Sequence, residues 1–241
     1  MPNHIQNKLF VSASNKETLN YFLDSIKGTN NFDDAEQVID FNTIIPMPSV
    51  LNDTESSTTT HESIYYYLMM NDKLNLVDKI LPFPSLYSAD RVLKNKTEEK
   101  LKEMYELGEK YFVEIFNKCS AIDWYEWRCK NWGTKWNAYD SYYDMLSETQ
   151  VLIYFQTAWS GVPKLIELLV QKFPTLQFEY KYSDEDMGYN CGVGNGINGH
   201  FEFEYYGIFS DETMEIYKEC WGIDDDTLLK DENGKWIFVD E

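Results

Sequence analysis

The sequence predicts an α+β fold: an antiparallel sheet covered by helices, with a mostly helical insertion. Three observations indicate it. A strand–helix–strand pattern opens the chain, a long amphipathic helix pattern lies in its middle, and apolar and polar residues alternate through much of its second half. Period-two alternation is typical of half-buried strands, and a spacing of three to four residues is typical of helices. At 241 residues and 43% hydrophobic content, the chain is long enough to bury a substantial core.

Residues 1–50 are predicted to form a strand, a helix and a second strand. The first strand is expected over Asn7–Ser14. Asn15 is a good residue to cap the helix that follows, and Gly28 is expected to end it. Residues 38–45 are rich in β-branched side chains and are followed by Pro46, which favours a strand that stops there.

The helical insertion is expected over residues 51–120. It opens with a loop rich in Ser, Thr, Asn and Asp, after which a short helix is predicted over Glu62–Asn71. The sequence Leu81-Pro-Phe-Pro84 predicts a break. The longest predicted helix spans Glu98–Lys118, because its apolar residues recur on a single stripe.

Residues 121–207 are predicted to be the β-rich part of the fold. Trp132, Thr134 and Trp136 alternate with polar residues and are expected to share one face of a strand. The mostly apolar face of the next strand is made of Val151, Ile153, Phe155, Thr157 and Trp159. A helix is expected to open near Pro163 and stop at Pro174. A further alternating strand follows, with Leu176, Phe178, Tyr180 and Tyr182 on one face.

Residues 188–199 are predicted to form a glycine-rich turn before the clearest half-exposed strand in the chain. In that strand, residues 201–205, aromatic residues alternate with glutamates. Residues 208–241 are predicted to be an acidic C-terminal helix and tail, with Ser210 as the helix cap and an edge strand over Lys235–Val239. The order of these elements fits a ferredoxin-like, split βαβ arrangement.

Three short segments carry a resemblance to a known family. They are Asn131–Asp140 (NWGTKWNAYD), Phe155–Trp159 (FQTAW) and Phe173–Phe178 (FPTLQF). With Met1–Ile5 and Ile44–Pro48, they make the chain similar to the Api92/YubB-like family over residues 1 to about 200. The resemblance implies a ferredoxin-like domain and an origin on plasmids or phages. It implies no catalytic residues, because the family's biochemical role is not established.

Negative charge is concentrated near the C-terminus. The chain has a net charge of −20, and residues 179–241 contain 17 carboxylates against four lysines, a net charge of −13. Such a surface repels nucleic acid phosphates and anionic membranes and attracts basic protein surfaces. Eight acidic residues are the candidates for binding a basic partner: Glu202, Glu204, Asp211, Glu212, Glu215, Asp224, Asp225 and Asp226. The simpler alternative is that they keep the chain soluble.

Composition also indicates the cellular compartment of the protein. The N-terminus lacks the apolar core of a signal peptide, and no window approaches the roughly 18 apolar residues of a membrane span. Cys119, Cys129, Cys191 and Cys220 have no metal-like spacing. We therefore expect a protein of the bacterial cytoplasm with reduced thiols.

Motifs for catalysis and for cofactors are weak. The run Gly194–Gly199 spells G-x-G-x-x-G, but a strand is predicted after it where a dinucleotide site needs a helix, so a hairpin turn is the better interpretation. The three histidines, His4, His61 and His200, are not at ligand spacing. The clusters at 184–186 and 224–226 have the oxygen ligands that hard cations prefer, but charge runs are usually solvated. We predict no catalytic residues, no metal and no cofactor.

The tryptophan-rich segment supplies a second candidate site. A polar cleft beside it would be lined by Trp132, Thr134, Lys135, Trp136, Asp140, Thr157, Trp159 and Tyr182. The competing interpretation places the tryptophans in the core and Lys135 in solvent.

The favoured hypothesis is a non-enzymatic, acidic protein-binding module of a mobile genetic element. It would act as a counter-defence inhibitor, an anti-CRISPR protein or nucleic-acid mimic, that occludes a basic host protein such as a nucleic-acid-binding or defence protein. We expect no direct contact with nucleic acid or membrane. The alternatives are a small-ligand binder or enzyme that uses the polar cleft, and an assembly protein whose tail contacts its own copies.

Overall fold

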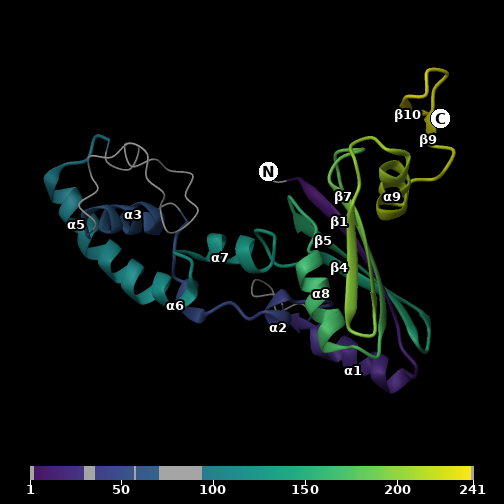
Figure 1. The fold of residues 1–241 in the computed structure, drawn as a ribbon, viewed down its shortest axis with the longest axis horizontal. Helices are drawn as coiled ribbons and strands as arrows, with labels where there is room; N and C mark the ends of the chain where they lie inside the picture. Colours follow the sequence, from purple (N-terminus) through teal and green to yellow (C-terminus); the bar gives the residue numbers. More distant parts are fainter. Residues whose placement is uncertain (1–2, 30–35, 57, 71–93, 240–241) are drawn as a thin grey trace. The chain divides into compact units, whose positions relative to one another are not determined.

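The computed structural model describes residues 3–29, 36–56, 58–70 and 94–239 (Figure 1). The chain forms two compact units. One comprises Met1–Pro46 and Trp132–Glu241, and the other Met47–Asn131. We call them the sheet unit and the helical unit. The predicted break at Leu81–Pro84 lies outside the described residues.

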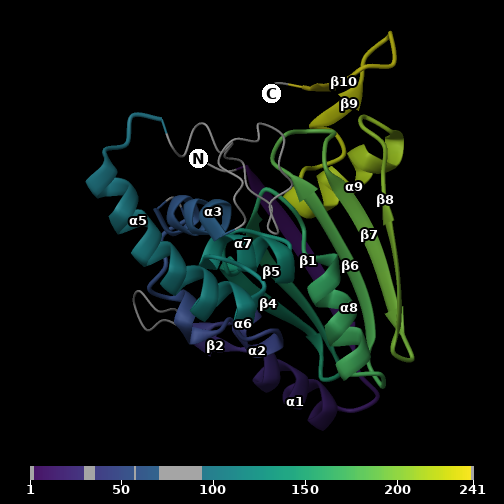
Figure 2. The same cartoon turned by 60° about the vertical axis from the view of Figure 1, so that its left-hand side comes forward.

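The sheet unit is built on six antiparallel strands in the order β4-β5-β1-β6-β7-β8 (Figure 2). Their bounds are β1 His4–Ser12, β4 Tyr139–Ser147, β5 Gln150–Ala158, β6 Gln177–Asp184, β7 Cys191–Ile197 and β8 His200–Tyr205. The central strand, β1, pairs with β5 on one side and β6 on the other. The α+β prediction and the strands predicted near residues 7, 151, 176 and 201 are confirmed.

One face of the sheet carries the core. Period-two alternation puts Leu9, Ile153 and Tyr180 on neighbouring strands of this face, and all three are fully buried. Two helices pack on it, α1 (Lys16–Ile26) and α8 (Pro163–Lys172). The rings of Phe22 in α1 and Phe178 in β6 meet edge to face at 5.7 Å. Figure 2 shows α8 in front of the sheet, beside β6.

The sequence signals for these two helices act as predicted. The Asn15 side chain accepts a hydrogen bond from Thr18 N–H at 2.8 Å, which caps α1. Pro163 occupies the first turn of α8, where no intrahelical N–H bond is lost.

The opposite face of the sheet is covered in part by α9 (Asp211–Trp221). Ile216 and Cys220 of α9 pack against Cys191 of β7, and Glu219 forms ion pairs with Lys8 (3.3 Å) and Lys181 (2.5 Å) on the sheet. The cap at Ser210, predicted from sequence, accepts from Thr213 N–H at 3.1 Å. Helices therefore cover both faces of the sheet rather than one.

The chain ends in a hairpin of β9 (Leu228–Lys230) and β10 (Trp236–Phe238). This confirms the strand predicted at 235–239, which pairs with β9 and not with the large sheet. Both views place the hairpin beyond α9 (Figures 1 and 2).

The strand predicted over residues 38–45 is wrong. Phe41–Ile44 is a short helix, α2, and only Glu36–Gln37 (β3) pairs, with Gly28–Thr29 (β2). The Asp40 carboxylate accepts from Asn42 N–H at 2.8 Å, so a local cap overrides the β-branched composition.

The strand predicted at Trp132–Trp136 is also wrong. Residues 124–131 form helix α7, residues 132–138 form an irregular segment that bends the chain, and β4 starts at Tyr139. Trp132 is fully buried because its ring packs on Phe41 and its Nε1–H donates to Ile45 O at 2.9 Å. Trp159 does not share the buried face of β5: it lies just beyond the strand and is 43% exposed.

The glycine-rich stretch 188–199 is mostly a strand and not a turn. Gly192, Gly194 and Gly196 lie in β7, and only Asn198–Gly199 make the tight turn to β8. A Cβ at Gly192 or Gly194 would collide with the ring of Phe203 or Phe201. The glycines therefore make room for aromatic side chains of β8.

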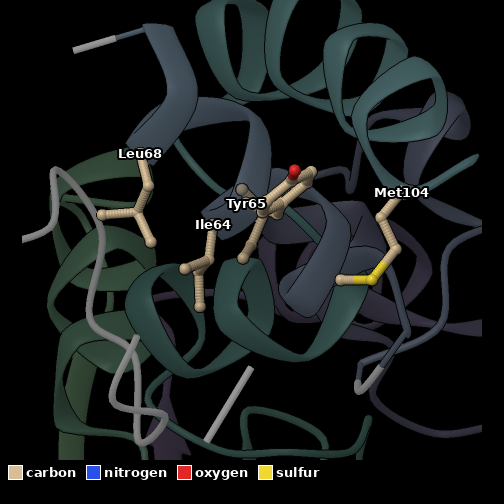
Figure 3. Close-up of a cluster of buried hydrophobic side chains, with 5 residues drawn as sticks. Ile64, Tyr65, Leu68 and Met104 are labelled. Atoms are coloured by element: carbon tan, nitrogen blue, oxygen red, sulfur yellow. The ribbon is translucent and has the colours of Figure 1, made fainter. Parts of the chain in front are cut away.

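The helical unit contains η1 (Ser49–Leu51), α3 (Thr58–Met70), α5 (Glu98–Lys110), η2 (Tyr111–Phe116), α6 (Asn117–Cys119) and α7 (Trp124–Asn131). The helix predicted over 98–118 is present, with a π-helical turn at η2. Its core joins Ile64, Tyr65 and Leu68 of α3 to Met104 of α5 and to Ile122 (Figure 3).

Gly108 sets the closest approach of α3 and α5. A Cβ at this position would lie inside van der Waals contact with the Glu62 carbonyl oxygen. We expect Gly108→Ala to push the helices apart and lower the free energy of unfolding of the helical unit by about 1–3 kcal/mol. Urea denaturation followed by circular dichroism measures this.

Gly207→Ala is the matched control, because nothing lies within 4 Å of the Cβ it would gain. Equal free energies of unfolding for the two variants would show that the α3–α5 contact is not close-packed.

Candidate functional site

A buried polar network holds one end of the sheet unit together. Asn7 of β1 is fully buried, and its Nδ2 donates to Thr157 Oγ1 at 2.9 Å and to the Ile5 and Phe155 carbonyls at 3.0 and 3.2 Å. The Tyr180 hydroxyl donates to Asn7 Oδ1 at 2.6 Å and accepts from Val162 N–H at 2.8 Å. Three strands and the start of α8 are thereby joined through one asparagine.

The network fixes the turn between β5 and α8. Thr157 Oγ1–H donates to Ser160 O at 2.7 Å, and Gly161 packs so closely on the Tyr182 ring that no Cβ fits there. The exposed residue of this turn is Trp159, whose φ of 70° is in the left-handed region that costs a bulky residue energy. Its N–H donates to Asn3 O (3.0 Å) and its carbonyl accepts from Asn190 Nδ2 (2.9 Å).

Lys135 lies between two indoles. Its Nζ is 5.1 Å from the ring centroid of Trp136 and 5.2 Å from that of Trp159. Both distances are within the range of cation–π attraction. Trp136 and Lys135 are half-buried, so the group forms part of the surface.

Beside this group, Tyr139 joins β4 to β5 and β1. Its hydroxyl donates to Thr157 O at 3.1 Å and lies 2.9 Å from His4 Nδ1. Burial, with the nearby charges of Asp140 and Glu185, raises the pKa of Tyr139 to about 12. Tyr139 is therefore protonated at neutral pH and acts as a hydrogen-bonding group.

The predicted cleft is brought together only in part. Four of its eight residues are core residues: Trp132, Thr134, Thr157 and Tyr182. Thr134 Oγ1, for example, donates to Ala158 O at 2.8 Å and accepts from Ala158 N–H at 3.1 Å. Lys135 and Trp136, both half-buried, and the exposed Trp159 form a group at the surface, and Asp140 is exposed with a φ of 46°. The cleft predicted from sequence left out His4, Asn7 and Tyr139, because their contacts join segments that are distant in the sequence.

The eight predicted acidic residues are all exposed. Glu202 and Glu204 lie on β8; Asp211, Glu212 and Glu215 lie on α9; Asp224, Asp225 and Asp226 follow α9. Glu204 raises the pKa of Tyr206, and Glu212 adds to the effect, so the end of β8 and the start of α9 are close together.

Lysines neutralise part of this surface. Lys230 binds Asp211 at 2.6 Å, and Lys218 contacts Glu215 and Asp225, both at 3.3 Å. Among the described residues, five of the eight candidates have no lysine within ion-pair distance: Glu202, Glu204, Glu212, Asp224 and Asp226. Glu202 lies 3.5 Å from His200.

The weaker motifs do not form sites in the described structure. Among the described residues, no three His, Cys, Asp or Glu side chains could together hold a metal ion. The Asp184 carboxylate accepts from Asn3, Asn190 and the Asp186 N–H, each at 3.0 Å. The run at 194–199 is strand–turn–strand and offers no helix N-terminus to a phosphate.

None of the four cysteines, all within the described residues, forms a disulfide, and burial raises the pKa of Cys119, Cys191 and Cys220. A high pKa lowers the thiolate fraction, which makes these three thiols poor nucleophiles at neutral pH. Within the part of the chain that is described, no helix is long and apolar enough to cross a membrane.

Comparison with known proteins identifies the second half of the chain. Residues 131–224 match a family whose description is "ferredoxin-like domain in Api92-like protein". The match covers less than half of the chain and shows that this part of it resembles the ferredoxin-like domain of Api92-like proteins. The match starts at Asn131 and covers the tryptophan-rich segment, β4 to β8 and α9, so the resemblance and the ferredoxin-like fold predicted from sequence are confirmed.

One solved structure is similar to the chain. It is the crystal structure of protein Api92 from Yersinia pseudotuberculosis, with 9% identity, a TM-score of 0.38, and coverage of 87% of this chain and 100% of that one. At this identity and TM-score the likeness bears on no functional argument. The chain matches none of the curated proteins with which it was compared.

Two carboxylates of the helical unit have raised pKa values that the sequence does not reveal. Burial raises the pKa of Glu126 from its ordinary 4.5 to about 7, although Ile122 N–H donates to it at 2.9 Å. Burial also raises the pKa of Glu62, which is 2% exposed. Glu126 N–H in turn donates to Asp123 at 2.7 Å, so Glu126 is part of the cap of α7.

This makes the stability of the helical unit depend on pH. Below about pH 4.5, Glu126 is protonated in both the folded and the unfolded chain, so folding is not penalised. As pH rises from 4.5 through about 7, only the unfolded chain releases the proton freely, and the folded state loses stability. Glu126→Gln keeps an oxygen for Ile122 N–H and cannot ionise.

Between pH 4.5 and about 7, the free energy of unfolding of wild type should fall relative to that of Glu126→Gln. Allowing for solvent screening, we expect the difference to reach the order of 1–2 kcal/mol. Urea titrations at several pH values measure it. Glu114→Gln, at an exposed position in the same unit, is the control. Parallel pH profiles for wild type and Glu126→Gln would contradict the assignment.

Proposed function

We propose that this chain is a non-enzymatic, acidic protein-binding module of a mobile genetic element, and that it acts in the bacterial cytoplasm. In this proposal it occludes a basic surface on a host protein that handles nucleic acid or defends the cell. Counter-defence inhibition, by mimicry of nucleic acid, is the activity that suits such a surface. The mobile-element origin rests on the Api92/YubB-like resemblance.

The observation that carries the proposal is the exposed acidic surface of β8, α9 and the segment after α9. All eight acidic candidates are exposed, and the charges of Glu204 and Glu212 both raise the pKa of Tyr206. Two elements thus contribute to one negative surface. Such a surface speeds encounter with a basic partner and discriminates against acidic ones.

Charge density sets a limit on mimicry. Glu202 and Glu204 are two residues apart on one strand, so their spacing is about 6.7 Å. Along the helix axis of duplex DNA, each strand has one charge per about 3.4 Å and the two strands together one per about 1.7 Å. β8 alone therefore has a lower charge density than even one strand of the duplex. Glu212, Asp224 and Asp226 are needed to raise the density, and we expect the proposed contact to use α9 together with β8.

Charge reversal tests the contribution of β8. We expect Glu202→Lys with Glu204→Lys to weaken partner binding at least about tenfold at low salt, because each reversed charge replaces attraction by repulsion. The partner is captured from host lysate on the tagged chain, identified by mass spectrometry, purified and titrated at about 50 and about 200 mM salt.

Glu106→Lys with Glu109→Lys is the matched control, since it makes the same net charge change at exposed positions of α5. If both double variants lose binding equally, net charge and not this surface is responsible. Binding that does not weaken with salt would remove the mimicry mechanism.

A second function is favoured by one observation. Trp159 is exposed, is held in a left-handed conformation, and encloses Lys135 together with Trp136. Strained residues at surfaces are often retained for function, so a small-ligand or substrate site at these three residues is the alternative proposal. Lysine and two indoles suit a ligand with both an anionic group and a flat ring.

A ligand screen by thermal shift tests this alternative. A true ligand should lose at least about tenfold affinity with Trp159→Ala, since stacking area is removed. Tyr142→Ala, at a 53% exposed aromatic residue of β4, should bind as wild type does. Equal loss in both variants would argue for non-specific adsorption.

A further inference from the structure

The C-terminal hairpin has one apolar face that the fold does not use. Ile237 lies directly opposite Leu229, and Val239 continues the same face because its N–H donates to Thr227 O at 2.8 Å. Leu229 is 44% exposed, Ile237 39% and Val239 44%. We call these three residues the outer stripe.

The inner face of the hairpin already supplies its packing. Leu228 is fully buried against Met214 and Tyr217 of α9. The Trp236 ring is 5.0 Å from Lys218 Nζ and 5.2 Å from Lys230 Nζ. A two-stranded hairpin needs one packed face to be stable, and this one has it. The outer stripe is therefore not required for folding, and threonine would satisfy strand propensity at each position equally well.

Charge around the outer stripe is acidic. Asp224, Asp225 and Asp226 precede β9, and Asp231 and Glu232 lie in the turn before β10, which also contains one lysine, Lys235. Lys218 and Lys230 face inward, toward Trp236 and toward Asp225 and Asp211. An apolar centre with a charged rim is the usual anatomy of a protein interface.

We propose that the outer stripe is the apolar centre of the partner-binding surface, and that its occupant is a basic amphipathic helix of the partner. This rests on the proposed function and adds the chemistry of the contact. Ile237 and Val239 are about 6.7 Å apart along the strand. Apolar residues at positions i and i+4 of a helix are about 6 Å apart, so they match the stripe while flanking Lys or Arg residues meet the acidic rim.

The proposal also explains how an acidic module obtains lasting affinity. Exposed charge pairs mainly raise the association rate and are screened by salt, whereas buried apolar anchors slow dissociation. Binding should therefore have a salt-sensitive part, from the acidic residues, and a salt-resistant part, from the outer stripe.

The test uses the full chain and a defined probe. The probe is a fluorescent helical peptide of about 18 residues, long enough to hold a helix, with leucines on one stripe and lysines elsewhere. A scrambled peptide of the same composition has the same charge without the stripe. Anisotropy titrations are run at about 50 and about 200 mM salt.

We expect the amphipathic peptide to keep binding at the higher salt and the scrambled peptide to be lost. Leu229→Thr with Ile237→Thr should weaken the amphipathic peptide about tenfold at the higher salt. Ile197→Thr, at a 52% exposed isoleucine of β7, should stay within about twofold of wild type. Threonine preserves strand propensity. Unchanged near-ultraviolet circular dichroism checks that the packing of the variant is intact.

Three results would overturn the inference. The first is equal binding of the two peptides at the higher salt. The second is equal binding of the amphipathic peptide by wild type and by the Leu229/Ile237 double variant. The third is a salt-resistant dimer of the chain that the double variant abolishes, with no binding of either peptide.

Failure of the proposed function gives a different result. In that case Glu202→Lys with Glu204→Lys leaves peptide binding unchanged at both salt concentrations, while the outer-stripe variant still weakens it.

Discussion

The hydrogen bonds of Asn7 are the constraint on which the sheet unit depends. A buried amide that is fully bonded contributes modestly to stability, but a partner left unsatisfied in the core costs about 1–3 kcal/mol. Asn7 satisfies Tyr180, Thr157 and two strand carbonyls at once. Its network specifies how β5, β1 and β6 align and where α8 begins. The position of Trp159 follows, because the turn that carries it is tied to Thr157 and Tyr180 through Ser160 and Val162.

Glycines have the complementary role of removing side chains where elements approach closely. Gly161 leaves room for the Tyr182 ring, and Gly192 and Gly194 leave room for Phe203 and Phe201. The ring planes of Tyr182 and Phe203 differ by 2° at a centroid distance of 6.1 Å across the glycine strand. This explains why β7 contains so much glycine and yet stays a strand: aromatic rings from β6 and β8 cover it. Aromatic neighbours compensate for the packing that glycine lacks.

Period-two and helical spacing predicted most of the fold, because burial of one face dominates wherever an element is long. The strands around Ile153, Tyr180 and Phe203 and the helices of α1, α8 and α9 follow from it. The errors occur where individual hydrogen bonds decide. Asp40 caps a helix inside a β-branched run through a local bond to Asn42 N–H. The Trp132 indole donates to Ile45 O, a long-range partner that the alternation of its neighbours does not reveal.

The candidate site likewise has features that the sequence pattern predicts and features that depend on tertiary contacts. Exposure of the acidic residues was predictable, since carboxylates in charge runs stay in water. Which cleft residues are exposed was not predictable, because it depends on contacts between distant segments: Thr134 with Ala158, Tyr139 with His4, and Lys135 with Trp159. The pKa of Glu126 depends equally on tertiary burial.

Lysine placement connects the electrostatics of the chain to the proposed function. Lys218 and Lys230 both lie over the Trp236 ring, and each also binds an acidic residue of α9 or of the segment after it. These lysines therefore attach the hairpin to α9 and leave little positive charge pointing outward. A solubilising tail would need only the carboxylates. Here a hairpin with an apolar outer face is also held beside these carboxylates. This arrangement favours the interpretation that the surface binds a partner over the interpretation that it only keeps the chain soluble.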